Sequence, residues 1–324
     1  MSTRCRVVVL LGCLVLLVAV AGGYVLSRRA SNQAVAADGR IDLGRVGTIV
    51  VRDLRPGASY NHLAQLGLGD PEHRVDSADT CVRVYAVRGH GVCLRPSVEA
   101  AGTFEVAFLD EHARVLSSFP LVGVPSRTRI SPDGQLFSWT VFVQGDSYNG
   151  GRFSTRSGLY DAGTDELVGT LEDSDVTLDG HPYQAADLNF WGVTFAHDDR
   201  TFYATMSTAG ERYLIRGDLA AHTITTLHRN VECPSLSPDE TRIAFKKRFG
   251  ETWRFAVLDL ATGTETLLAE QRSVDDQLAW LDDDTLLYGV RRDPRHADVW
   301  SVPADGSGRP SLVVPDADSP ASVR

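Results

Sequence analysis

Beyond residue 45, hydrophobic residues occur in short runs separated by turn-forming residues, and two units alternate along the chain. The first unit is a short strand that ends in Asp, followed by a turn and a return strand. It is clearest at Val50–Gly57 and Val257–Gly263, with weaker copies at 108–110, 159–161, 217–219 and 299–302. Short apolar or β-branched runs bounded by Gly, Pro and Asp are typical of strands joined by tight turns. The first unit therefore predicts about six hairpins.

The second unit is a short strand, a Pro-Asp or Asp-Asp turn and an apolar strand. It appears at 131–139, 196–204, 237–245 and 281–288, with a divergent copy at 88–94. Proline presets φ in such turns, while Asp and Gly tolerate the remaining backbone angles. Together the two units give a repeat of about 40 to 45 residues with four strands, named A to D.

A four-stranded repeat cannot bury both of its faces alone, but radial stacking of several repeats buries them. The sequence therefore predicts an all-β fold, a β-propeller of about six four-stranded blades. Residues 46–70 supply only a C–D hairpin in this interpretation, so the first blade is incomplete or borrows strands from elsewhere. Beyond the N-terminal segment no sustained helical period is present.

The turns at Ser131–Gly134 and Ser237–Asp239, with the strands that follow them, resemble the repeats of TolB-like propellers, relatives of the WD-type repeats. The turn at Asp259–Gly263 completes the resembling unit, and the resemblance covers most of residues 46–315. It implies a propeller that works through protein contacts. TolB carries an α/β domain before its propeller, and residues 27–45 are too short for that domain, so only the binding mode carries over.

The N-terminal segment is an apolar run from Val7 to Leu26, with arginines on both sides. Twenty helical residues span roughly 30 Å, the thickness of a bilayer core. We therefore expect a signal anchor or transmembrane helix in residues 1–26, a linker in 27–45 and the propeller in 46–324, outside the cytoplasm. Two alternatives stay open: cleavage near Ala21 followed by secretion, and a lipoprotein acylated at Cys13.

The composition of the chain restricts the classes of partner and bears on the cellular compartment of the protein. The formal net charge of −10 argues against binding to nucleic acid phosphates, and 43% hydrophobic residues suffice for a large core. In an exported chain, Cys81 and Cys93 are close enough in sequence to form a disulfide, while Cys233 stands alone. If the turn between them is Arg88–Gly91, Cys93 faces Ala86, and the disulfide then requires a bend near Cys81. The alternative is two ordinary buried thiols.

Catalytic and metal-binding motifs are not recognisable. The sequence contains no Gly-x-Ser-x-Gly element, no phosphate-binding glycine loop and no paired histidines at zinc spacing. Asp173-x-Asp175 followed by Asp179-Gly180 lacks the closing Glu of a calcium loop, and we interpret it as a solvated insertion. No catalytic residue, cofactor or metal ligand is assigned, although calcium stays open because several connectors carry hard oxygen ligands.

The candidate site follows from blade geometry. B–C loops and D–A connectors emerge on one face of a propeller, and A–B and C–D turns emerge on the other. On the first face, acids, arginines, amides and aromatic residues gather, as in a ligand pocket. The candidates are Arg127, Arg129, Asp146, Tyr148, Arg152, Arg156, Asp187, Asn189, Trp191, Glu232, Ser235, Asp275, Asp276 and Gln277. The competing interpretation is that they form hydrogen bonds between neighbouring blades.

The sequence favours a membrane-anchored extracytoplasmic binding or scaffold module that engages a protein partner or a small ligand at this face. The alternative is an extracytoplasmic lyase or hydrolase, with or without calcium, that uses Glu232, Asp275 or Asp276 as acid and base. Carboxylates within about 5 Å of each other in an open cleft would indicate an enzyme or a metal site. Carboxylates that are each paired with arginine would indicate a structural role.

Overall fold

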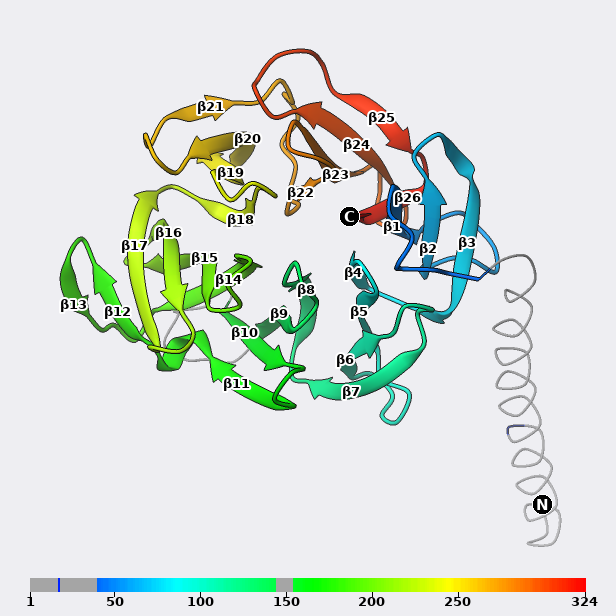
Figure 1. The fold of residues 1–324 in the computed structure, drawn as a ribbon, viewed down its shortest axis with the longest axis horizontal. Coiled ribbons are helices and arrows are strands. Elements are labelled where there is room, and N and C mark those ends of the chain that lie inside the picture. Colours follow the sequence, from blue (N-terminus) through cyan, green and yellow to red (C-terminus); the bar gives the residue numbers. More distant parts are fainter. Residues whose placement is uncertain (1–16, 18–39, 144–153) are drawn as a thin grey trace, which may run out of the picture.

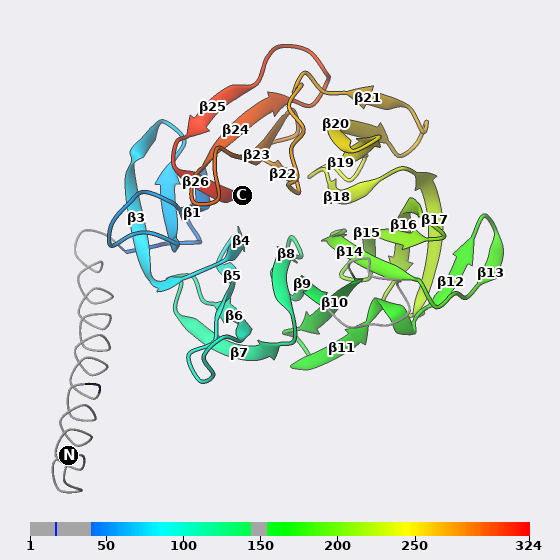
Figure 2. The same cartoon turned by 180° about the vertical axis from the view of Figure 1, so that it is seen from behind.

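The computed structural model describes residue 17, residues 40–143 and residues 154–324. Within them, six β-sheets are arranged as the blades of a propeller (Figure 1). The innermost strands β4, β8, β14, β18, β22 and β26 surround the axis (Figure 2). The predicted propeller of six four-stranded blades is therefore confirmed.

In each blade the strands succeed one another from the axis outward. Blade 1 contains, in this order, β26 (Ala317–Val323), β1 (Thr48–Asp53), β2 (His62–Gly67) and β3 (Asp70–Thr80). Blade 2 contains β4 (Arg83–Val87), β5 (His90–Pro96), β6 (Phe104–Leu109) and β7 (Val115–Leu121). Blade 3 contains β8 (Val124–Ile130), β9 (Leu136–Val143), β10 (Ser154–Asp161) and β11 (Glu166–Thr170).

The remaining blades follow the same order. Blade 4 contains β14 (Asn189–Phe195), β15 (Thr201–Thr208), β16 (Glu211–Asp218) and β17 (Thr223–Arg229). Blade 5 contains β18 (Glu232–Leu236), β19 (Arg242–Phe249), β20 (Thr252–Asp259) and β21 (Glu265–Leu267). Blade 6 contains β22 (Ala279–Trp280), β23 (Thr285–Arg291), β24 (Ala297–Pro303) and β25 (Ser311–Val314).

Blade 1 closes the ring by combining the two ends of the propeller. The N-terminal region supplies strands B, C and D, and β26 supplies strand A through antiparallel pairing with β1. Thr48 pairs with Val323 and Asp53 with Ala317. Of the two alternatives for this blade, an incomplete blade or a borrowed strand, the second is confirmed. Residues 46–70 contain strands B and C rather than a C–D hairpin. Strand D was missed because Asp70–Thr80 is polar and only one of its eleven residues is buried.

A segment between blades 3 and 4 enlarges blade 4. It consists of a 3-10 turn, η2 (Leu171–Asp173), and the strands β12 (Asp175–Leu178) and β13 (His181–Tyr183). Strand β12 pairs parallel to β17, so this sheet has six strands. The insertion that we expected around Asp173–Gly180 therefore lies at the outer edge of blade 4.

The core lies between the blades. Six hydrophobic clusters are buried among the described residues, one at each interface between neighbouring blades. Between blades 2 and 3, for example, the ring of Phe108 stacks on Tyr160 with 4.6 Å between centroids. Because each blade is covered on both faces by its neighbours, the ring is one continuous core.

The Pro-Asp turns occupy the A–B positions, as the sequence predicted. In blade 5, Ser237 donates to Asp239, whose carboxylate accepts from the backbone N–H of Thr241. In blade 3, Ser131 and Asp133 form the same contact. These aspartates therefore hold turns closed by accepting local hydrogen bonds.

The N-terminal boundary of the propeller lies before residue 46. Ile41 and Leu43, which the sequence places in the linker, are buried between blades 1 and 2. Leu43 donates to the carbonyl of Glu111 and accepts from Gly89. The predicted membrane segment lies, apart from Leu17, outside the described residues. Among the residues that the structure describes, no helix combines the length and hydrophobicity needed to cross a membrane.

Cys81 and Cys93 form a disulfide with 5.5 Å between their Cα atoms, which excludes the alternative of two separate thiols. The turn is tighter than expected: it comprises Arg88 and Gly89 only, and Cys93 faces Val84 rather than Ala86. The chain bends at Val82, between β3 and β4. This is the bend near Cys81 that the pairing requires.

Candidate functional site

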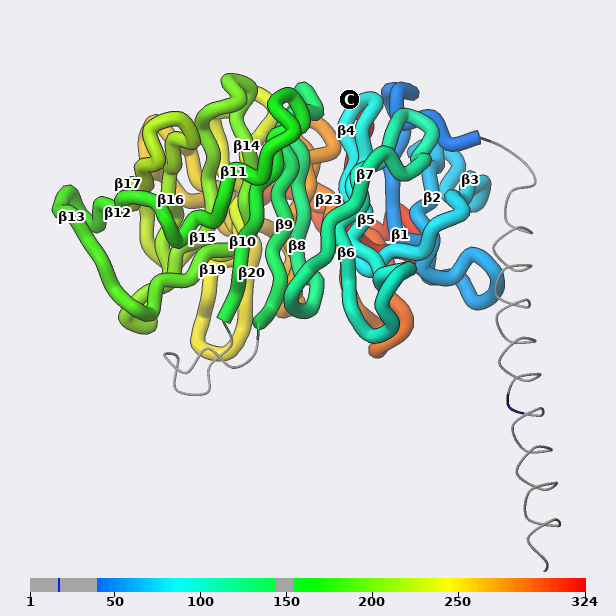
Figure 3. The backbone as a smooth tube through the Cα atoms, turned by 90° about the horizontal axis from the view of Figure 1, so that it is seen from below, coloured from blue at the N-terminus to red at the C-terminus, as the bar shows by residue number. Residues whose placement is uncertain are grey.

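The two faces of the ring differ in the kind of loop that they carry. We call the side with B–C turns and D–A connectors the connector face, and the side with A–B and C–D turns the turn face. In Figure 3 the β19–β20 turn lies at the lower side and the C-terminus at the upper side, so the connector face is below.

A cavity of about 420 Å³, which we name the connector pocket, opens between blades 3, 4 and 5. It is lined by Ser126, Arg127, Thr140, Phe142, Thr155, Trp191, Glu232, Cys233, Lys246, Trp253 and Asp275. Four of the predicted candidates therefore come together in it: Arg127, Trp191, Glu232 and Asp275. They approach from different blades, as the geometry of the fold predicted.

Three of these four residues lie on innermost strands rather than in connectors, which corrects the sequence interpretation. Arg127 belongs to β8, Trp191 to β14 and Glu232 to β18. The register shifts beside each of them, as in a β-bulge. Such shifts interrupt the alternation that would have revealed a strand in the sequence.

The bulges of blades 4 and 5 touch each other. Gly192 and Cys233 both have positive φ, +67° and +50°. A Cβ at Gly192 would lie 2.7 Å from the Cα of Cys233, so only glycine is accommodated there. This contact brings Trp191 and Cys233 to the same wall of the connector pocket.

Asp275 joins two cations at the edge of the pocket. Its Oδ1 accepts from Arg127 at 3.0 Å and from the ammonium of Lys246. The Lys246 side chain is only 3% exposed, so its charge depends on this partner. Burial alone would raise the pKa of Asp275, but Lys246 and Arg127 outweigh it and lower the pKa to about 2. Asp275 is therefore a carboxylate at neutral pH.

Trp253 forms an aromatic wall beside these charges. The Lys246 ammonium lies 4.8 Å from the centroid of the indole ring, and the Arg248 guanidinium carbon lies 5.5 Å from it. Cations at this distance are attracted to the electron-rich face of the ring. The indole N–H of Trp253 is buried without a hydrogen-bond partner, so the wall retains an unused donor.

Glu232 is paired with arginines rather than with a second acid. Its side chain is buried, with Arg212 at 3.3 Å and Arg248 at 3.9 Å from Oε1. Asp275 has its own cationic partners, Arg127 and Lys246. An acid–base pair needs two carboxyl groups whose environments separate their pKa values, and these carboxylates are each neutralised by cations.

The other described candidates mostly connect blades. Asp276 accepts from the backbone of Gly289 at 2.8 Å and from Arg83 at 3.3 Å. Gln277 donates to the carbonyl of Pro234 at 2.8 Å. These contacts match the competing interpretation, in which polar connector residues hold neighbouring blades together.

Three further candidates have similar contacts within or between blades. Asn189 accepts from the backbone of Thr155 at 2.9 Å, and Asp187 accepts from Thr208 at 2.7 Å. The carbonyl of Ser235 accepts from the Trp280 indole at 2.9 Å.

The last candidates lie away from the connector pocket. Arg156 is exposed on β10. Arg129 lines a different cavity, on the turn face. Asp146, Tyr148 and Arg152 lie outside the described residues.

Sequence reasoning missed Lys246, Trp253 and Phe142 as pocket residues. They lie near the ends of regular B and C strands, which the repeat pattern treats as structural. One signal was present: Lys246 and Lys247 are the only lysines in the sequence. No three His, Cys, Asp or Glu side chains among the described residues gather as a metal site would require.

Solved structures share this fold. TolB from Acinetobacter baumannii matches with a TM-score of 0.60 and 20% identity, over 85% of this chain and 66% of that chain. A putative TolB from Agrobacterium tumefaciens matches with a TM-score of 0.50 and 12% identity, over 85% and 92%. A chain of a nidogen/laminin complex matches with a TM-score of 0.57 and 10% identity, over 85% and 98%.

No family model and no curated protein matches the sequence. The chain covers only 66% of the length of the A. baumannii TolB. At identities of 20% and below, the structural matches define the architecture alone. The chain has the TolB-like six-bladed β-propeller fold.

Proposed function

We propose that the protein is a binding propeller whose connector face engages a partner protein. The observation that carries this proposal is a set of exposed apolar residues on the connector face. Val98 and Val122 are 80% and 77% exposed. The whole set is Val98, Val122, Val124, Phe142 and Phe249. Exposed apolar groups that gather on one face of a soluble domain mark interaction surfaces.

The connector pocket supplies an anchoring point within this surface. Interfaces derive most of their affinity from a few aromatic and arginine groups in desolvated pockets. Trp253 and Phe142 form apolar walls, and Arg127 and Lys246 are held in place by Asp275. Propellers of the same architecture support the general mode, since one of them was solved in a nidogen/laminin complex.

The enzymatic alternative has less support. Glu232, Asp275 and Asp276 each bind a separate cationic group. This is the arrangement that we associated with structural carboxylates rather than with an acid–base pair. The binding role therefore remains the better explanation of the pocket.

The proposal places the propeller outside the cytoplasm, anchored through residues 7–26. Its support is the Cys81–Cys93 disulfide, because disulfides persist mainly in oxidising compartments. A phosphatase fused after Arg324 should be active only when exported. Recovery of that fusion in membranes indicates the anchor, and recovery in the medium indicates cleavage near Ala21. Activity confined to the cytoplasm contradicts this setting.

The binding face can be tested by site-specific photo-crosslinking of the full chain in its own cells. A photoreactive residue is placed at Phe249, on the connector face, or at Thr262, on the turn face of the same blade. We expect a discrete adduct from position 249 that is lost when Trp253→Ala is added, while the melting temperature shows that the variant is folded. An adduct from position 262 and none from position 249 would show that the turn face, not the connector face, binds the partner.

A further inference from the structure

The turn face carries a second cavity on the propeller axis, which we name the axial pocket. It has a volume of about 270 Å³, and every blade contributes to it. One representative from each of blades 1 to 6 is Arg324, Tyr85, Arg129, His197, Ser237 and Trp280. It lies on the opposite side of the ring from the connector pocket, so its role is separate from the function proposed above.

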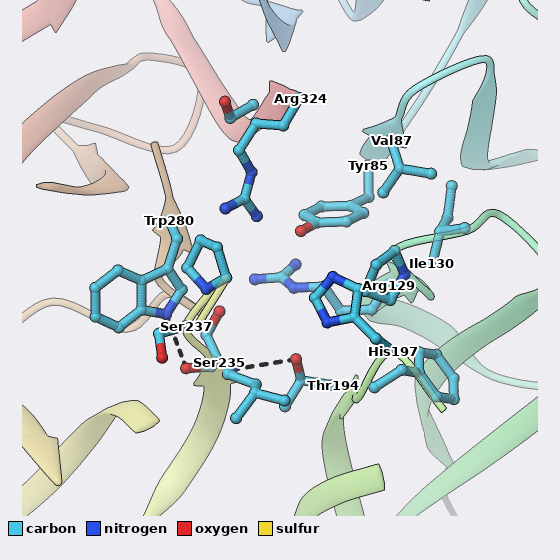
Figure 4. Close-up of a pocket in the computed structure, with 15 residues that line it drawn as sticks. Tyr85, Val87, Arg129, Ile130, Thr194, His197, Ser235, Ser237, Trp280 and Arg324 are labelled. Atoms are coloured by element: carbon cyan, nitrogen blue, oxygen red, sulfur yellow. Dashed lines mark hydrogen bonds between the residues drawn. The ribbon is translucent and has the colours of Figure 1, made fainter. Parts of the chain in front are cut away.

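Two guanidinium groups point into this space from different sides (Figure 4). Arg129 comes from β8 and is only 7% exposed. Arg324 follows β26 directly. Like charges repel each other when water is excluded, so two converging guanidinium groups need compensation.

Arg129 is compensated only in part by its neighbours. Its terminal nitrogens donate to the backbone carbonyls of Thr128, Gln277 and Leu278, at 2.8 to 3.3 Å. Its Nε is buried without a hydrogen-bond partner. The guanidinium lies over the ring of Tyr85, 4.3 Å from the centroid. None of these contacts is with a carboxylate, and burial lowers the pKa of Arg129.

The acidic side chains near the pocket bind groups other than Arg129 and Arg324. No Asp or Glu is among the described residues that line the axial pocket, although the chain has 42 acidic and 32 basic residues. Glu240 accepts from His197. Asp276 binds Gly289 and Arg83. The cavity is therefore a local concentration of positive charge in an acidic protein.

We propose that the axial pocket binds a small organic oxyanion, a carboxylate or a phosphate ester. A guanidinium presents paired N–H donors that match the two oxygens of either group. The hydroxyls of Tyr85 and Ser235 line the same space and supply further hydrogen bonds. Trp280 provides a flat apolar wall for the organic part (Figure 4). The volume admits a small molecule and excludes a folded partner.

The test is calorimetric titration of the purified full chain with inorganic phosphate and with malonate, at constant ionic strength. The variants are Arg324→Gln, which removes one guanidinium from an exposed residue, and Arg129→Lys, which keeps the charge and removes the planar donor pair. The matched control is Arg309→Gln, an exposed arginine in the β24–β25 turn.

We expect the wild type and Arg309→Gln to bind at least one oxyanion equally. Arg324→Gln should weaken binding about ten- to a hundredfold, the typical loss of charge-assisted hydrogen bonds. Stronger binding of phosphate identifies a phosphate-bearing ligand, and stronger binding of malonate identifies a dicarboxylate. If the Arg129→Lys variant unfolds, the binding of oxyanions by Arg324→Gln alone decides whether the proposal holds. Absence of binding to the wild type, or equal binding by Arg324→Gln and Arg309→Gln, overturns the proposal.

Discussion

At the scale of single residues, the connector pocket depends on charges that cannot be removed singly without cost. The Lys246 side chain is almost completely buried, and Lys246 and Arg127 both bind the carboxylate of Asp275. Removing one member of a buried pair leaves the other charge desolvated. Asp275 itself is 60% exposed on its side chain, so water reduces this effect.

Asp275→Asn should therefore lower the free energy of unfolding by about 1 to 2 kcal/mol. Urea denaturation at neutral pH measures this. Glu251→Gln is the control. The Glu251 side chain is 96% exposed and its ion pair with Arg248 is long, at 3.7 Å, so this substitution should leave stability unchanged. Equal effects of the two substitutions would show that Lys246 does not depend on Asp275.

A second residue-scale prediction concerns pH. Burial would raise the pKa of Asp239, but hydrogen bonds from Ser237 and Thr241 outweigh it and lower the pKa to about 2. The unfolded chain then takes up the proton first, so stability from this group is complete above about pH 4 and is lost as the pH falls through about 2. Denaturation of Asp239→Asn should show a smaller loss of stability across this window than the wild type. Parallel pH profiles for the two proteins would contradict the assigned contacts.

At the scale of elements, the disulfide fixes the junction between blades 1 and 2. It joins the bend after β3 to the middle of β5, with a sequence separation of 12 between the cysteines. Both cysteines belong to the same hydrophobic cluster, so the covalent bond and the core packing stabilise the same junction between the two blades.

Reduction of this disulfide should cost about 2 to 4 kcal/mol of stability, mainly by freeing the unfolded chain. Melting curves with and without reductant measure the effect. The double variant Cys81→Ala/Cys93→Ala should not respond to reductant. A wild-type protein that melts identically under both conditions would show that the core alone fixes the junction.

Turns and strands were predictable from the sequence where residues close together in the chain determine their geometry. Ser131–Gly134 and Ser237–Glu240 define turns through their own side chains, so their positions follow from sequence. Strand β3 and the first residues of β8 were not predictable in this way. Their polar residues are accommodated by pairing with neighbouring strands and by register shifts, which depend on contacts distant in sequence.

At the scale of the whole molecule, the pairing of β1 with β26 decides whether the ring closes. All seven residues of β26 are buried, and Arg52 forms an ion pair with Asp318 across this pair. The site follows from this closure as well. Arg129 and Arg324 lie about two hundred positions apart in the sequence, and only the closed ring brings them to one cavity. This is why the repeat pattern predicted the fold but not the axial pocket.

Ala321→Asp should therefore destabilise the protein by about 3 kcal/mol or more, because it buries an unpaired carboxylate at the closing strand. Ala100→Asp, in an exposed loop of blade 2, is the matched control and should change stability little. Chemical denaturation monitored by tryptophan fluorescence compares the two. Equal stability of both variants would show that closure tolerates a charge at β26.

The strand that closes the ring is also synthesised long after its partner β1. Strand β1 ends at Asp53 and β26 begins at Ala317. At typical translation rates, roughly 15 to 50 s separate the appearance of these two partners from the ribosome. For that interval blade 1 presents the unpaired edge of β1. Until β26 is made, the ring cannot close, and the edge of β1 is exposed to any chaperone that binds unpaired strands.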